Sequence, residues 1–162
     1  MKLLTPTIYY KDIYIIDYQK LKKQGIKCLL FDLDNTCVGY HEKLPTKKLE
    51  ELFNKLKKMN FQVIIFSNAR KKRIEPFKKL SIICHPLSKK PLKFNFKKLM
   101  KKYNYKKEEI CIIGDQLFTD VLGGNRVGIM TCLVEPLTKD DFIITKIFRK
   151  IENHIKSKRS YQ

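Results

Sequence analysis

The sequence contains few cysteines and no long apolar run. No stretch approaches the length of a membrane-spanning helix, which argues against an integral membrane protein. The first residues lack the apolar core and small-residue cleavage site of a secretory signal, so we predict a cytoplasmic protein. The five cysteines show no Cys-x-x-Cys spacing, which argues against a disulfide framework or a zinc site.

Acidic residues are also scarce, with 16 of them against 35 basic residues and a formal net charge of +19. The basic residues are nearly all lysine, whereas arginine is the residue favoured for forked recognition of phosphates and bases. We therefore do not expect sequence-specific binding of nucleic acid. A diffuse positive field would still concentrate anionic substrates or attract an anionic membrane surface.

Alternating apolar runs and amphipathic stretches predict one α/β domain, in which helices cover both faces of a parallel sheet of about five strands. The predicted strands lie near residues 26–32, 61–66, 81–85, 110–114 and 129–134. The predicted helices lie at residues 46–59 and 93–103, with a less regular stretch at 69–80 that contains Pro76. Residues 1–25 are taken as an N-terminal extension of this domain.

The C-terminal stretch 141–157 has the pattern of an amphipathic helix, with an isoleucine-rich stripe opposite basic residues. Two interpretations stay open for it. It could pack on the sheet as the last helix of the domain, or it could lie on an anionic membrane as a basic amphipathic helix.

Two pairs of carboxylates follow predicted strands. Asp32 and Asp34 end the first of the five runs, and Asp115 and Asp120 follow the run at 110–114. Ligands in open α/β sheets bind beyond the carboxyl ends of the strands. Magnesium prefers one or two carboxylates together with phosphate and water, so this pattern predicts a site for a divalent cation and a phosphate.

The chain resembles the haloacid-dehalogenase-like (HAD) phosphatases, because the four motifs of that superfamily occur in order. The first motif is Asp32-Leu33-Asp34-Asn35-Thr36, and the second is Ser67-Asn68 after an apolar run. The third is a lysine, most simply Lys90, and the fourth is Gly114-Asp115 with Asp120 five positions on. Each motif alone has an ordinary structural explanation, such as a helix cap or a turn, and their order carries the resemblance.

This resemblance implies a Rossmann-like three-layer fold and an aspartyl-phosphate mechanism. It implies that Asp32 is the nucleophile and that Asp34 is the general acid and base. A magnesium ion would be held by the Asp32 carboxylate, the Asp34 main-chain carbonyl and Asp115. Asp120 is expected to support the metal shell or to orient the lysine of the third motif.

The resemblance also implies how the phosphoryl group is held. Ser67 and the main-chain amide of Asn68 would bind it, and Lys90 would stabilise its charge. Lys89, the neighbour of Lys90, leaves the assignment of this lysine open.

The runs at residues 3–6, 21–27 and 114–126 resemble a subgroup, the YqeG-type phosphatases, which lack a cap domain and are related to mitochondrial phosphatidylglycerophosphatases. The short interval between Asp34 and Ser67 leaves no room for an inserted cap. This resemblance implies phosphatidylglycerophosphate as substrate, with peripheral contact at the inner face of an anionic membrane. Two alternatives remain: a phosphatase of a soluble nucleotide or sugar phosphate, and a basic RNA- or ribosome-associated factor with little turnover.

Overall fold

The computed structural model describes residues 2–138 and 153. Six parallel strands form one sheet in the order β1-β6-β5-β2-β3-β4. The strands are β1 (Ile8–Tyr10), β2 (Cys28–Phe31), β3 (Gln62–Phe66), β4 (Ile83–His85), β5 (Ile110–Gly114) and β6 (Met130–Val134). The predicted α/β class and parallel sheet are confirmed, with six strands where the sequence indicated about five.

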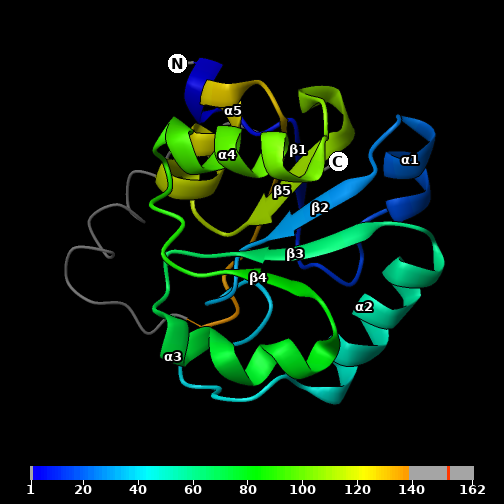
Figure 1. Cartoon of the computed structure of the whole chain (residues 1–162), viewed down its shortest axis with the longest axis vertical. Helices are drawn as coiled ribbons and strands as arrows, with labels where there is room; N and C mark the ends of the chain where they lie inside the picture. The colour runs from blue at the N-terminus through cyan, green and yellow to red at the C-terminus, as the bar shows by residue number, and fades with distance from the viewer. Residues whose placement is uncertain (1, 139–152, 154–162) are drawn as a thin grey trace.

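Helices cover both faces of the sheet (Figure 1). The α-helices are α1 (Tyr18–Lys23), α2 (Lys47–Lys58), α3 (Lys71–Ile74), α4 (Lys93–Tyr103) and α5 (Leu122–Val127). The shorter turns are η1 (Lys2–Leu4), η2 (Glu75–Leu80), η3 (Lys107–Glu109) and the π-helical turn η4 (Leu117–Val121). In Figure 1, α4 and α5 lie on one side of the sheet, and α2 and α3 lie on the other.

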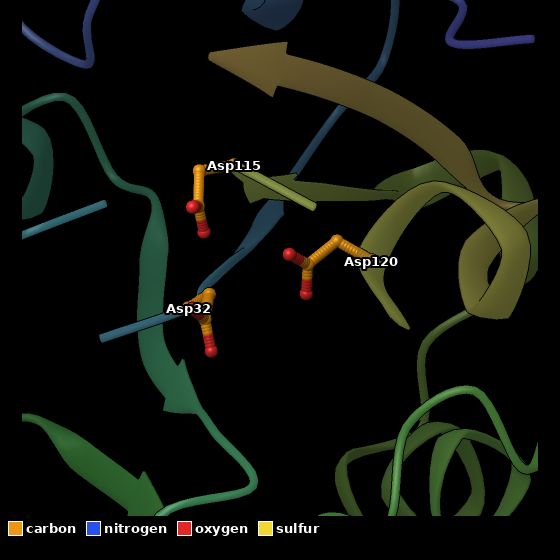
Figure 2. Close-up of side chains that lie close together, drawn as sticks. All are labelled: Asp32, Asp115 and Asp120. Atoms are coloured by element: carbon orange, nitrogen blue, oxygen red, sulfur yellow. The ribbon is translucent and has the colours of Figure 1, made fainter. Parts of the chain in front are cut away.

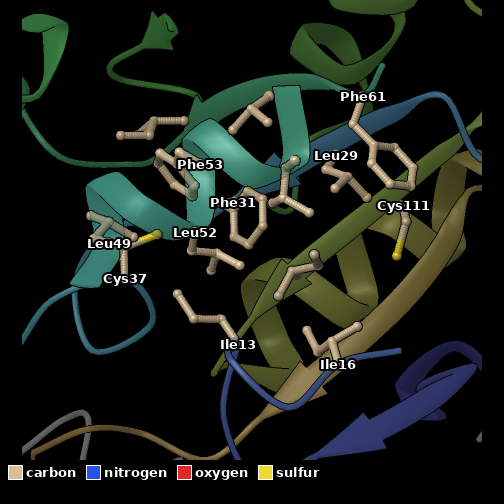
Figure 3. Packing of buried hydrophobic residues seen from close by; sticks show 14 of the residues in the cluster. Ile13, Ile16, Leu29, Phe31, Cys37, Leu49, Leu52, Phe53, Phe61 and Cys111 are labelled. Atoms are coloured by element: carbon tan, nitrogen blue, oxygen red, sulfur yellow. The ribbon is translucent and has the colours of Figure 1, made fainter. Parts of the chain in front are cut away.

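The alternation of side chains along the strands divides the core between the two faces. In β2, Leu29 and Phe31 face a large cluster that includes residues of α1 and α2. Cys28 and Leu30 face a second cluster that includes Phe96 of α4. Figure 3 shows the first cluster, which contains Phe31 and Phe53. The centroids of these two rings lie 5.1 Å apart. Both faces of the central strands are therefore buried, as expected for a parallel sheet.

Most predicted helix boundaries agree with the structure. Thr46 caps α2, because its side-chain oxygen accepts a hydrogen bond from the Leu49 amide. The irregular stretch at 69–80 splits into α3 and η2, with Pro76 in the first turn of η2. The predicted helix at 141–157 lies outside the described residues, apart from residue 153.

Within the segment taken as an N-terminal extension, residues 1–25, the described residues 2–25 contribute a strand and a helix to the fold. Its β1 strand pairs with β6 at the edge of the sheet, and the Thr7 amide donates to the Thr131 carbonyl at 2.9 Å. Leu21 of α1 is buried in the larger core cluster. All five cysteines are free, as the sequence predicts, and none of the described helices is long and apolar enough to cross a membrane.

Candidate active site

The strand order places the two predicted carboxylate pairs side by side. From β2 the chain continues through β3 to β4 on one side, and then returns to form β5 on the other side. The carboxyl ends of β2 and β5 therefore lie at the topological switch point of the sheet, where ligands bind in open α/β folds. Asp32 directly follows β2 and Asp115 directly follows β5, and the Asp32 amide donates to the Ile113 carbonyl at 2.9 Å.

Asp120 reaches the same edge of the sheet from the turn η4. Figure 2 shows its side chain beside those of Asp32 and Asp115. One carboxylate oxygen from each of the three residues lies within 4.8 Å of the others, and all three residues are buried. A Cβ atom at Gly114 would collide with the Asp120 carboxylate, so the glycine of the fourth motif makes room for this side chain.

Lys90 is the cation of this cluster. Its Nζ donates to Asp32 Oδ1 at 2.7 Å and to Asp120 Oδ1 at 2.6 Å. The backbone of Lys90 is held by the Asn68 side chain, which accepts from its amide at 2.7 Å and donates to its carbonyl at 3.0 Å. Lys89, in contrast, is exposed at the surface. Of the two candidate lysines, only Lys90 contacts the carboxylates.

The pKa values of Lys90 and Asp120 are shifted by burial in one direction and by the oppositely charged partner in the other. Burial alone would lower the pKa of the Lys90 ammonium, but the charges of Asp120 and Asp32 outweigh it and raise that pKa above its usual value. Burial raises the pKa of the Asp120 carboxyl, and the nearby Asp32 charge adds to this effect, while Lys90 opposes it. Among residues 2–138, the cluster therefore holds three carboxylates and the ammonium group of Lys90, which is a surplus of negative charge.

That surplus fits a divalent cation. Three buried carboxylates face one ammonium group, and oxygen ligands of this kind are those that hard cations prefer. Thr36 donates its hydroxyl to Asp115 Oδ1 at 3.2 Å, which fixes the orientation of that carboxylate from outside the cluster. Asp32, Asp115 and Asp120 could thus hold a metal ion, with Lys90 as a competing partner for two of them.

The second motif forms a loop beside Lys90. Ser67 is buried, its amide donates to the His85 carbonyl at 3.1 Å, and its hydroxyl accepts from the Ala69 amide at 3.1 Å. The main-chain amides of Asn68 and Asp34 donate no hydrogen bond within residues 2–138. Free amides at a strand end can bind an anion such as a phosphoryl group.

Asp34 pairs with an arginine that the sequence did not single out. Arg73 Nε donates to Asp34 Oδ1 at 2.9 Å, and Arg73 Nη2 lies 2.7 Å from the same oxygen. Oδ2 of Asp34 accepts no hydrogen bond from the described residues. Burial raises the pKa of the Asp34 carboxyl above its usual value, although the Arg73 charge and hydrogen bond lower it in part. Asp34 is therefore a carboxyl with one oxygen fixed and the other available.

The model of the family described as "Mitochondrial PGP phosphatase" matches residues 1–138. The chain belongs to this family. It is 38% identical over 157 residues to the "Probable phosphatase YqeG" of Bacillus subtilis, an alignment that covers 96% of this chain and 91% of the relative. It is 27% identical to the "Phosphatidylglycerophosphate phosphatase 1, chloroplastic/mitochondrial" of Arabidopsis thaliana, covering 91% of this chain and 46% of that protein.

Solved structures show the same fold at lower identity. The cobalt-bound deoxy-D-mannose-octulosonate 8-phosphate phosphatase of Haemophilus influenzae matches with a TM-score of 0.57 and 19% identity, over 80% of this chain and 77% of that one. A putative HAD hydrolase of subfamily III A from Legionella pneumophila matches with a TM-score of 0.55 and 21% identity, over 74% and 71% of the two chains. The protein is a phosphatase with the HAD fold, as the sequence predicted.

In this phosphatase, all the predicted site residues lie in the connections that leave the carboxyl ends of β2, β3, β4 and β5. Arg73 is the polar partner that sequence reasoning missed. Two signals could have pointed to it: arginine is rare in this lysine-rich chain, and Arg73 lies five residues after Asn68 of the second motif. Its pairing with Asp34 depends on the alignment of β2 with β3, which the sequence does not state.

Proposed function

We propose that this chain is a magnesium-dependent phosphomonoesterase that acts through an aspartyl-phosphate at Asp32 on phosphatidylglycerophosphate. The observation that carries the reaction is the buried cluster in which Lys90 bridges Asp32 and Asp120 beside Asp115. The family and the plant relative support the lipid substrate. The strongly positive charge of the chain suits a substrate presented by an anionic membrane.

In the first step, a carboxylate oxygen of Asp32 attacks phosphorus, and the bond between phosphorus and the leaving alcohol breaks. Lys90 holds Oδ1 of Asp32, while Oδ2 accepts no hydrogen bond within the described residues and can attack. Asp34 gives its proton to the leaving oxygen from its free Oδ2. The amides of Asn68 and Asp34 and the Ser67 hydroxyl stabilise the charge on the phosphoryl oxygens.

In the second step, Asp34 takes a proton from a water molecule, which attacks the acyl-phosphate and releases inorganic phosphate. The Asp32 carboxylate is thereby restored. A magnesium ion held by Asp32, Asp115 and the main-chain carbonyl of Asp34 would neutralise part of the negative charge that gathers in both steps. Asp120 orients Lys90 through the hydrogen bond that joins them.

The experiment that tests this function is a substrate panel with matched variants. Phosphatidylglycerophosphate in vesicles is compared with soluble nucleotide, sugar and aryl phosphates, with magnesium and with a chelator. We expect turnover of the lipid to be the fastest, to need magnesium and to be abolished in Asp32→Asn. Glu51→Gln, on the exposed face of α2, serves as the charge-matched control and should match wild type.

The panel also separates the alternatives. Faster turnover of a soluble phosphate would replace the lipid assignment but keep the reaction. If wild type and Asp32→Asn were equally inactive on every ester, the phosphatase reaction itself would be rejected for this chain.

A further inference from the structure

The connection that carries Lys90 displays large apolar side chains at the surface. Leu87 is 47% exposed and Leu92 is 53% exposed, and Phe94 in the first turn of α4 is 72% exposed. We call these three residues the apolar rim. Lys90 lies between Leu87 and Leu92 in the chain, so the rim borders the loop that brings the lysine to the site.

The backbone of this loop is held in place by hydrogen bonds. The Leu87 amide donates to the Ala69 carbonyl, and the Leu92 amide donates to the Lys89 carbonyl, each at 2.9 Å. The side chain of Asn68 fixes the Lys90 backbone between them. The backbone beneath the rim is therefore held in place by hydrogen bonds. The same contacts connect the rim to the second motif and to Lys90.

Leu87 has an unusual backbone conformation. Its φ angle is 52°, in the left-handed region that is unfavourable for a side chain with Cβ, and its side chain is not buried in return. Glycine would adopt this conformation without strain. Lys89 in the same loop has a similar φ of 51°, so the path of the loop imposes this conformation and keeps the Leu87 side chain about half exposed.

The surface around the rim carries charge of one sign. Between Glu75 and Glu108 the sequence has no acidic residue and eleven lysines. Lys93 lies between Leu92 and Phe94, Lys97 and Lys98 follow along α4, and all three lysines are exposed. A cavity of about 330 Å³ opens in the same region and is lined by Leu87, Ser88, Asn95, Lys98 and Lys102 among others. Apolar side chains flanked by lysines, beside a hollow with both polar and apolar lining, match the interface of an anionic bilayer, with acyl chains below and phosphate headgroups above.

We propose that the apolar rim and Lys93, Lys97 and Lys98 form a membrane-docking surface for anionic lipid bilayers. Leu87, Leu92 and Phe94 enter the region between headgroups and acyl chains, and the three lysines bind the lipid phosphates. Because the rim shares its loop with Lys90, docking brings the carboxylate cluster to a phosphate in the plane of the headgroups. This inference deepens the proposed function and rests on it for the identity of the substrate.

An anionic bilayer fits this surface better than RNA does. The segment from 76 to 107 contains no arginine, and the two rim residues that flank Lys90 are leucines, which offer bases no ring to stack on. Leucine and phenylalanine gain free energy by leaving water for the acyl region. RNA binding would draw on the lysines and on the ring of Phe94 but not on the two leucines, and it is an outcome that the test distinguishes.

The test measures binding of the full chain to vesicles of phosphatidylcholine with and without phosphatidylglycerol. Leu87→Gly is the first variant, because it relieves an unfavourable backbone conformation and should melt no lower than wild type. We expect it to weaken binding to the anionic vesicles by about tenfold, as one leucine no longer leaves water. Leu92→Ser with Phe94→Ser should weaken binding by on the order of 10²-fold.

Matched controls test whether the place of the substituted side chains, rather than their chemical type, decides vesicle binding. Ile15→Ser removes an apolar side chain of similar exposure, 57%, outside the rim and should bind like wild type. Lys93→Gln with Lys97→Gln should weaken binding by about fivefold per lysine, and only to vesicles that contain phosphatidylglycerol. Lys55→Gln with Lys58→Gln removes the same charge from α2 and should have a much smaller effect.

Hydrolysis of a soluble aryl phosphate is measured in the same preparations. Rim variants that lose vesicle binding and lipid turnover far more than soluble turnover support the docking surface. Wild-type vesicle binding by Leu87→Gly and by the double rim variant would overturn it, as would binding that depends on the lysines but not on the rim. Rim-dependent binding without hydrolysis of any phosphate would support docking while rejecting the proposed function.

Discussion

The two acidic residues of the first motif stand in different environments, although one residue separates them. Asp32 belongs to an inner cluster, where the side chains of Lys90 and Asp120 are each only 1% exposed and that of Asp32 is 11% exposed. Asp34 belongs to an outer pair with Arg73, where the two side chains are 26% and 21% exposed. The same residue type is thus placed in two settings by a chain that turns directly after β2.

Charge differs between the two settings as much as exposure does. The outer pair is balanced, with one carboxylate against one guanidinium. Among the described residues, the inner cluster sets three carboxylates beside the ammonium group of Lys90, a charge balance that suits a further cation. An unbalanced, dry cluster suits metal and phosphate, whereas a balanced pair near solvent suits proton transfer. In the proposed mechanism, proton transfer and nucleophilic attack are therefore separated by environment rather than by distance along the chain.

Lys90→Met should give the largest effect, because it removes the ammonium group that bridges Asp32 and Asp120. We expect kcat/KM for a soluble ester to fall by at least ~10²-fold, since stabilisation of the phosphoryl charge is lost. We also expect the free energy of unfolding to fall by roughly 3–5 kcal/mol without added metal, because buried carboxylates lose their partner. Kinetics and chemical denaturation measure the two effects.

Lys89→Met is the matched control, as it removes a neighbouring lysine that is exposed. It should change the free energy of unfolding by no more than about 0.5 kcal/mol and leave soluble-ester kinetics close to wild type. Similar losses in both variants would contradict the assignment of Lys90 as the lysine of the inner cluster.

Arg73→Gln tests the outer pair and should act selectively. If Arg73 positions Asp34 as a proton donor, its loss matters most for esters whose leaving alcohol needs a proton. We expect kcat/KM for an alkyl phosphate to fall by on the order of 10²-fold, a part of what acid–base catalysis supplies. For p-nitrophenyl phosphate, whose leaving group departs without a proton, the loss should be only a few-fold.

The pH profile gives a second measure of the same variant. Arg73 lowers the pKa of Asp34, so its removal should raise that pKa further. The limb of kcat/KM that reports loss of the Asp34 proton should therefore move to higher pH. In the Asp34→Asn background, Arg73→Gln should add little. Equal losses for alkyl and aryl esters would indicate that Arg73 has only a structural role.

The sequence predicted the inner cluster well because its residues follow strands. Apolar runs that end in Asp32 and in Asp115 predict two parallel strands, and parallel strands bring their carboxyl ends to one edge. Glycine before Asp115 belonged to the motif, and the structure adds its reason, which is the space that the Asp120 carboxylate occupies.

The sequence predicted the outer pair and the sheet edge poorly, for two physical reasons. Arg73 lies in α3, a helix of one turn that ends before Pro76. So short a helix shows no hydrophobic periodicity from which the side that faces the site could be predicted. The strand β1 spans three residues, Ile8–Tyr10, too few to show an alternating pattern, and it depends on its pairing with β6. Both features arise from contacts between segments far apart in the sequence.

Asparagine substitutions should change stability with opposite signs in the two settings, and both changes should be small. Without metal, Asp115→Asn removes one of three like charges from the inner cluster, and Thr36 can still donate to the new amide oxygen. We expect its melting temperature to equal that of wild type or to exceed it by up to about 2–4 °C. A shift of that size corresponds to a gain near 1 kcal/mol in the free energy of unfolding. Asp34→Asn, in contrast, leaves Arg73 without its carboxylate and should lower stability by about 1 kcal/mol.

Magnesium should reverse the order of the melting temperatures of wild type and Asp115→Asn. At about 100 times its dissociation constant, a bound ion adds roughly 2.7 kcal/mol to the stability of wild type, or about 5–10 °C in melting temperature. Asp115→Asn should lose most of that shift because it removes a metal ligand, whereas Asp34→Asn should keep it because its main-chain carbonyl is unchanged. Thermal melts with magnesium and with a chelator measure both. A lower melting temperature for Asp115→Asn without metal would show that the inner cluster is already balanced in the free protein, and the contrast between the two carboxylate settings would then fail.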